Sequence, residues 1–222
     1  MYAIIHKNRV LVGPKDWNRA FFTFALKQVK VLNPLIPRKP SDDILPLAID
    51  ADTKIVKAEV TKDTFDPMTQ GLSGPHYTIE QDRVIAEYRT TDMPIESARQ
   101  KFKDQAADER YKKEIAGAKA TIQEIEVTID TNRGARDIFV QKYLLMDDTE
   151  TVSWKFPEAW LNLTKAELAQ VVQAGAQHVQ GCFDWELNIG KQIDLAQNAE
   201  ELHAIEIVKK PEVPELQRTV TE

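Results

Sequence analysis

The sequence has a single cysteine among its 222 residues, Cys182, which excludes an internal disulfide framework and a cysteine-rich zinc site. It has no apolar run of the roughly 18 residues that a membrane-spanning helix needs, and its apolar start is too short for a signal peptide. Basic residues are outnumbered, giving a net charge of −6. We therefore expect a protein made in a reducing cytoplasm, with no nucleic acid and no membrane among its partners.

Residues 164–197 contain no proline and carry apolar residues at helical spacing, which predicts one helix of roughly 50 Å. Thr164 and Glu167 form a capping box at its start. The expected buried side comprises Leu168, Val171, Val172, Gly175, Val179, Cys182, Phe183 and Leu187. Glu186 falls on the same stripe, and an unpaired buried carboxylate costs several kcal/mol. Either Glu186 is paired or the helix has left its domain there; we favour the second, which makes Ile189 and Ile193 exposed.

The first part of the chain, residues 1–91, reads as a small, mostly β domain. Short β-rich runs flank two-residue and three-residue turns, and residues 55–60 alternate as a half-buried strand. Residues 17–31 fit neither the helical nor the strand period cleanly, so both remain open. The proline-rich residues 33–46 are expected to form an extended connection.

Residues 92–120 form a helix in this reading, with a start signal at Asp92 and Pro94. Its large apolar residues are sparse, so we expect a polar connecting helix rather than a core element. Residues 121–207 give the order strand, helix, hairpin, long helix and short helix, which predicts a small antiparallel sheet with helices on one face. Residues 208–222 are expected to be an extended tail. The fold class is α+β.

Candidate chemistry is weak throughout. His178 and Cys182 are four apart on the long helix, as two metal ligands can be, but a packing histidine and a small buried cysteine account for them better. No motif indicates a catalytic residue, a cofactor or a metal. Trp154 and Trp160, across a predicted hairpin, are expected to form a core pair. The residues expected to bind a partner are His178, Trp185, Ile189 and Ile193.

The C-terminal part, about residues 107–206, resembles a domain of unknown function found in tail-fibre, baseplate and tail-fibre-assembly proteins of tailed bacteriophages. The residues that carry the resemblance are Thr151–Trp154, Trp160, Leu163–Leu168, His178–Gln180, Cys182–Phe183 and Glu186, with 130–133 opening the preceding helix. They are fold-determining residues with no catalytic motif among them. The resemblance therefore implies a phage tail as the context more firmly than any activity.

The function expected on this basis is a non-enzymatic structural component of a phage tail, at the baseplate or the fibre attachment. It would hold other tail or fibre proteins together, form a homo-oligomer and reside in the virion after synthesis in the host cytoplasm. The first alternative is a tail-fibre assembly chaperone that is absent from the finished particle. A tail-associated glycan or peptidoglycan hydrolase is a further alternative, although no pair of acidic residues stands out for that chemistry.

Overall fold

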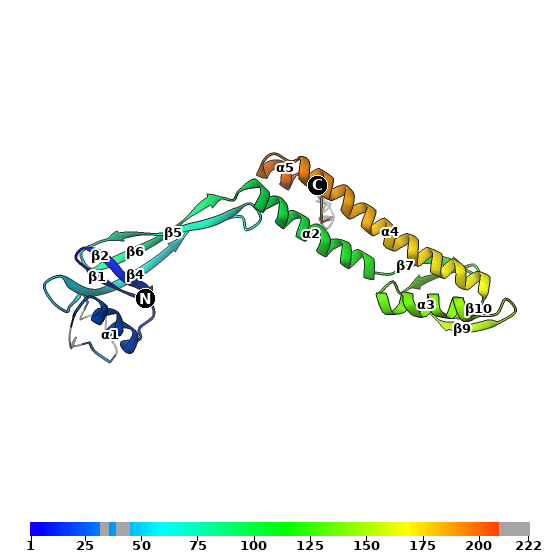
Figure 1. The fold of residues 1–222 in the computed structure, drawn as a ribbon, viewed down its shortest axis with the longest axis horizontal. Coiled ribbons are helices and arrows are strands. Elements are labelled where there is room, and N and C mark those ends of the chain that lie inside the picture. Colours follow the sequence, from blue (N-terminus) through cyan, green and yellow to red (C-terminus); the bar gives the residue numbers. More distant parts are fainter. Residues whose placement is uncertain (32–35, 39–44, 209–222) are drawn as a thin grey trace, which may run out of the picture. The chain divides into compact units, whose positions relative to one another are not determined.

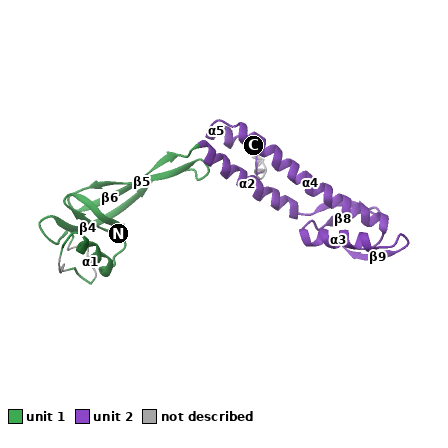
Figure 2. Cartoon of the chain, in the orientation of Figure 1, with its two compact units in different colours: residues 1–94 green, residues 95–222 purple. Residues whose placement is uncertain are grey.

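The structure, a computed structural model, describes residues 1–31, 36–38 and 45–208. The chain forms two compact units, residues 1–94 and residues 95–222 (Figure 2). The α+β fold class expected from the sequence is confirmed in both units. Most of the proline-rich segment 33–46, and all of the expected tail except Val208, lie outside the described residues.

The first unit is built on one curled, mixed sheet whose strands run in the order β2-β1-β4-β6-β5, with β3 paired to β4 (Figure 1). Its elements are β1 (Tyr2–His6), β2 (Arg9–Lys15), α1 (Arg19–Gln28), β3 (Leu47–Ala48), β4 (Thr53–Lys62), β5 (Gln70–Ile79) and β6 (Arg83–Asp92). The pairing of β4 with β6 is parallel, and the other pairings are antiparallel. The segment left open between strand and helix is therefore helical over α1, where Asn18 caps the first turn by accepting a hydrogen bond from the Phe21 amide.

Alternation along the strands gives this sheet two buried faces. On one face, Ile4 and Ile55 pack with Phe22 and Leu26 of α1. On the other face lies a separate cluster of small and β-branched side chains, which comprises Ala3, Ile5, Val56, Ala58 and Val84. The Tyr77 hydroxyl donates a 2.6 Å hydrogen bond to the Gly13 carbonyl, which links the two outermost strands, β5 and β2.

The second unit combines two long helices with two small hairpins and a shorter helix. Its elements are α2 (Ile95–Ile115), β7 (Ala118–Ile122), β8 (Ile125–Ile129), α3 (Arg133–Leu145), β9 (Thr151–Lys155), β10 (Trp160–Thr164), α4 (Lys165–Leu195) and α5 (Ala199–His203). The predicted capping box is confirmed: the Glu167 amide donates to Thr164 Oγ1 at 3.3 Å, and the Thr164 amide donates to Glu167 Oε2 at 2.8 Å.

Helix α2 is polar, as expected, and it packs along α4 as part of the second unit. The expectation that it contributes nothing to the core is wrong, because several of its residues are buried. Arg99 donates to the Ala196 carbonyl, Lys103 pairs with Asp194, and Arg110 pairs with Glu186. Numbers rise along α2 as they fall along α4, and the two helices are therefore antiparallel. The buried residues of α2 recur mainly every four positions and include small side chains that permit close approach: Ala98, Phe102, Ala106 and Glu114.

The hairpins, α3 and the first turns of α4 enclose the main core of this unit. Its fully buried side chains include Ile122, Val127, Ile129, Leu163, Leu168 and Val171. The expected pairing of the two tryptophans is wrong. Trp154 stacks on Phe139 with ring centroids 4.5 Å apart, whereas Trp160 is 68% exposed. The register places Trp160 opposite Lys155, the residue after Trp154, so the two indoles lie on opposite faces of the hairpin.

Candidate interaction surface on the long helix

Helix α4 carries two rows of residues along its length, and only one of them is buried. The inner row is the buried one and comprises Leu168, Val171, Gly175, Val179, Cys182, Ile189 and Ile193. Leu168, Gly175, Cys182 and Ile189 repeat in steps of seven. Val179 and Ile193 each fall four residues after one of them, which is the spacing of a helix seam. This row faces the hairpins at the start of α4 and continues beside α2 towards its end.

The inner row continues past Glu186 because that carboxylate is paired. Arg110 of α2 donates from Nε to Glu186 Oε2 at 3.0 Å, and the Glu186 side chain is 30% exposed. Of the two possibilities that the sequence left open, the structure therefore has the paired one. Helix α4 does not leave its packing partner at this point.

The exposure predicted for the C-terminal part of α4 is consequently wrong. Ile189 is 6% exposed and Ile193 is fully buried, while Phe183 and Leu187 are 44% and 59% exposed. The two isoleucines are therefore buried where the sequence predicted exposure, and Phe183 and Leu187 are exposed where it predicted burial. The reason is that Arg110 pairs with Glu186, so the buried seam continues past this carboxylate.

His178 and Trp185, the other two residues expected to bind a partner, are both engaged by Lys113 of α2. The His178 ring nitrogen Nε2 lies 2.8 Å from the Lys113 carbonyl oxygen, and the Lys113 ammonium lies 3.2 Å from the centroid of the Trp185 ring. Both side chains are half-buried. They therefore fasten α4 to α2 within one chain.

Cys182 is buried beside His178, with the sulfur 3.8 Å from Nε2. Burial, assisted by the nearby Glu114 carboxylate, raises the pKa of the Cys182 thiol. A thiol that is harder to ionise is a poor nucleophile and a poor metal ligand. Within the described residues, no group of three or more His, Cys, Asp or Glu side chains is arranged to hold a metal ion.

The most buried charge in this unit is the carboxylate of Glu114, a residue that is 1% exposed. Its Oε2 accepts from Arg110 of α2 and its Oε1 accepts from Arg136 of α3 at 2.9 Å. The Glu114 carbonyl also accepts from the buried Thr131 hydroxyl. A chain of charges, Glu186–Arg110–Glu114–Arg136, thus connects α4, α2 and α3.

The second row on α4, the outer row, is mostly exposed, although Asp194 pairs with Lys103 of α2. It comprises Ala176, Gln180, Phe183, Leu187, Gly190 and Asp194, which advance in alternating steps of four and three. Phe183 and Leu187 are its large apolar members. Phe183 also lies over the Arg110 guanidinium, at 4.6 Å from ring centroid to Cζ.

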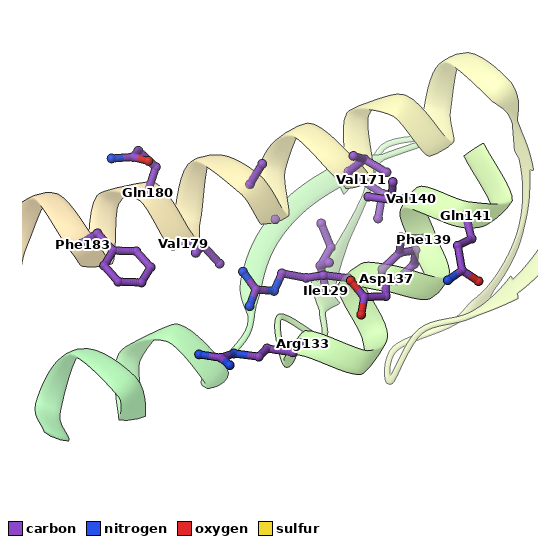
Figure 3. Close-up of a pocket in the computed structure, with 14 residues that line it drawn as sticks. Ile129, Arg133, Asp137, Phe139, Val140, Gln141, Val171, Val179, Gln180 and Phe183 are labelled. Carbon is purple, nitrogen blue, oxygen red and sulfur yellow. The ribbon is translucent and has the colours of Figure 1, made fainter. Parts of the chain in front are cut away.

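Two adjoining hollows follow the outer row, and we call them together the α4 groove. The first, of about 640 Å³, lies between α3 and α4 over Ile129 of β8 (Figure 3). Figure 3 shows Phe183 and Val179 of α4 facing the same space as Arg133 of α3. The second hollow, of about 560 Å³, lies between α2 and α4 and shares Gln180 and Phe183 with the first.

Charged side chains line both hollows of the α4 groove. The first hollow is lined by Arg133, Arg136 and Asp137. The second hollow is lined by three acidic and two basic residues, which are Asp184, Glu186, Asp194, Lys103 and Lys191. Ion pairs within the chain neutralise several of these charges: Arg136 pairs with Glu114, Glu186 with Arg110, and Asp194 with Lys103.

The two arginines of the first hollow are incompletely paired among the described residues. Arg136 Nε is buried without a hydrogen-bond partner there, although its Nη2 reaches Glu114. No ion pair involves Arg133 within the same part of the chain. Because Arg136 Nε is buried, Arg133, which is exposed, is the arginine of this hollow that is open to a carboxylate from another molecule.

The fold and this surface define the class of molecule: an α+β protein whose second unit is an antiparallel helix pair with an open groove on the longer helix. Residues 97–208, about half of the chain, match the family described as Domain of unknown function (DUF4376), and the chain belongs to that family. The match begins inside α2, ten residues before the resemblance seen in the sequence, so α2 is part of the family domain. No curated protein and no solved structure matches the chain. Among the described residues, no helix is long and apolar enough to cross a membrane.

Sequence reasoning found the groove's apolar residues but assigned them to the core, and it missed the arginines altogether. Phe183 and Leu187 were placed on the buried stripe by hydrophobicity. Arg133 and Arg136 lie on a different helix, and nothing local connects them to α4. The one signal in the sequence that could have revealed the outer row is its spacing, which alternates steps of four and three residues in parallel with the inner row.

Proposed function

We propose that this protein is a non-enzymatic structural component of a tailed-bacteriophage tail, at the baseplate or where fibres attach. Its role there is to hold other virion proteins together. It is synthesised in the host cytoplasm and ends in the virion. The phage context comes from the resemblance carried by residues such as Thr151–Trp154 and Leu163–Leu168, which lie inside the family domain.

The observation that carries the proposal is the α4 groove. A helix whose inner row is already packed still presents Phe183 and Leu187, at 44% and 59% exposure, beside hollows of several hundred Å³. Helix-in-groove binding uses apolar anchors at this spacing. The groove is therefore suited to holding a helix of another subunit, which is the work of an architectural protein.

An assembly chaperone would use the same kind of surface but would leave before the particle is complete. Protein mass analysis of purified virions separates the two. We expect this chain in a fixed ratio to the other tail proteins. Its presence in infected cells together with its absence from purified virions would overturn the structural role and favour the chaperone.

A matched pair of variants connects the groove to that role. Leu187→Asp places a charge in the groove, whereas Leu145→Asp changes a leucine that is 82% exposed at the end of α3 and does not line the groove. We expect Leu187→Asp to reduce incorporation into virions at least tenfold and Leu145→Asp to leave it unchanged. Equal incorporation of the two variants would contradict the use of the groove.

A further inference from the structure

Strand β9 has one edge without a partner strand in the described part of the chain, because its sheet consists of β9 and β10 alone. The Phe156 amide donates to the Ala159 carbonyl at 2.9 Å and closes the turn between the two strands. Hydrogen-bonded pairs alternate with non-bonded pairs from there back along the strands, so the backbone groups of Thr151, Ser153 and Lys155 point away from β10. We call these outward amides and carbonyls the β9 edge.

The outer edges of the neighbouring strands β8 and β10 are covered by side chains. On β8, the outward Thr128 amide donates to Glu158 Oε2 at 2.9 Å. On β10, the outward Asn162 carbonyl accepts from Gln123 Nε2 at 2.8 Å. Covering an edge in this way prevents unwanted strand pairing. The β9 edge has no such cover among the described residues, so it is open to another strand.

Helix α3 lies under β9 and has an exposed apolar side that is turned away from α4. Trp154 of β9 stacks on Phe139 of α3, which places this helix under the strand. At about 100° per residue, Ile138 and Leu145 lie on the side of α3 opposite to Val140, which lines the α4 groove. Ile138 and Leu145 are 56% and 82% exposed.

The exposed apolar side of α3 runs beside the β9 edge in the opposite direction. Towards one end, Ile138 and Lys155 line the same hollow, of about 200 Å³. Towards the other end, Lys142 pairs at 2.6 Å with Glu150, the residue before β9. Residue numbers therefore rise along α3 as they fall along β9. The β9 edge and the side of α3 that carries Ile138 and Leu145 form one surface, which we call the β9–α3 surface.

We propose that the β9–α3 surface binds a second copy of this chain across a two-fold axis beside Ser153, with the two β9 strands antiparallel. The two hairpins then join into one four-stranded sheet. The outward groups of Thr151, Ser153 and Lys155 are satisfied by the same groups of the second copy. A sheet of three or more strands over an apolar layer is stable where a two-stranded hairpin by itself is marginal.

The β9–α3 surface is complementary to itself. The axis exchanges its two ends, so Ile138 meets Leu145 of the second copy, and the hollow beside Ile138 receives that leucine. Lys155 lies opposite Thr151 of the second copy, and the two copies of Lys155 are about 14 Å apart, so like charges do not meet. Lys142 brings no unpaired charge to the contact, because it is already in an ion pair.

A second copy covers this surface better than an extended segment of another protein does. An extended segment would pair with the β9 edge but would leave Ile138 and Leu145 exposed. A second copy supplies a strand and a helix together, in the matching arrangement. The contact is on the order of 1,000 Å² in total, at the low end of stable interfaces, so we expect a dimer that dissociates on dilution.

The association does not use the α4 groove. A Leu145→Asp chain that has lost the pairing can still enter the virion through the groove. The pairing of copies and the proposed function therefore stand or fail separately.

Sedimentation velocity on the purified full chain, over about a hundredfold range of concentration, tests the association. We expect the mass to rise from that of one chain to that of two. Leu145→Asp should weaken the association at least tenfold. Leu144→Asp is the matched control and should leave it unchanged, because Leu144 is 71% exposed but lies one turn after Val140, on the side of α3 towards α4. A native chain that stays monomeric overturns the proposal, as does a dimer that both variants affect equally.

Oxidative cross-linking tests the register. Antiparallel pairing about Ser153 brings the Cα atoms of the two copies of this residue to about 5.5 Å, within reach of a disulfide. We expect Ser153→Cys to form a disulfide-linked dimer by itself, whereas Thr151→Cys should do so only when mixed with Lys155→Cys. The native chain, with its buried Cys182, is the control. Cross-linking of Thr151→Cys with itself, but not of Ser153→Cys, would show a different pairing and overturn the arrangement.

Discussion

Replacing Glu114 by glutamine is expected to destabilise the second unit by about 2–4 kcal/mol. The residue is 1% exposed and its carboxylate accepts from two arginines, Arg110 and Arg136. Removing one partner of a buried ion pair costs roughly 3–5 kcal/mol because the other charge stays desolvated. The arginine side chains keep 15% and 27% exposure, which lets water reach them and lowers the expected loss.

The loss is measurable by urea unfolding followed by tryptophan fluorescence. Three of the four tryptophans, Trp154, Trp160 and Trp185, lie in the second unit and report on it. With an unfolding slope near 1.5 kcal/mol/M, a loss of about 3 kcal/mol lowers the midpoint by about 2 M. The chain has two compact units, so the second-unit transition must be fitted by itself.

Glu126→Gln is the matched control, because Glu126 pairs with Lys119 at 3.6 Å and both side chains are more than half exposed. Its loss should stay below about 0.5 kcal/mol. In the double variant with Arg136→Gln, the second substitution should cost less than it does alone, because its partner is already gone. Equal losses for Glu114→Gln and Glu126→Gln would refute the reasoning that the buried carboxylate joins the helices.

Three further outcomes are expected in the same unfolding assay. Ile193→Ala should lose about 2–4 kcal/mol because Ile193 is fully buried, whereas Leu195→Ala, at a residue 74% exposed, should stay within about 0.5 kcal/mol; a reversed order would mean that the wrong face of α4 has been called buried. Thr164→Ala should lose about 1 kcal/mol by removing the cap of α4; an unchanged midpoint would show that the cap is dispensable. Hydrogen bonds from Thr128 lower the pKa of Glu158 to about 2 from its ordinary 4.5, so the advantage of the native chain over Glu158→Gln should be full above about pH 4.5 and disappear as the pH falls towards 2. Midpoints that converge on raising the pH instead would contradict that sign.

The parts of the fold that depend on neighbours in the sequence were predictable. Helix α4 was found with its start at the capping box, because the signal lies in Thr164, Glu167 and an uninterrupted helical period. The short helix after Asn198 was found for the same reason: Asn198 Oδ1 accepts from the Glu201 amide at 2.9 Å. Such signals are complete within one turn of helix.

The parts that depend on distant residues were not predictable. Helix α2 looked too polar to be core because its buried face uses Ala98, Ala106 and a charged pair in place of large apolar residues. The alanines allow the two helices to approach closely, and the charged residues form pairs across the helix interface. The tryptophan pair failed likewise, because the register of a hairpin decides which face a side chain takes.

The candidate surface was also missed because distant residues decide which row of α4 is buried. A helix with two apolar rows has one row for its own domain, and hydrophobicity alone favours the row with the larger side chains, Phe183 and Leu187. The structure chooses the other row because Arg110, 76 residues away in sequence, neutralises Glu186 and lets the seam continue to Ile193. Because the inner row is fully packed without them, the exposed anchors are surplus to the stability of one chain.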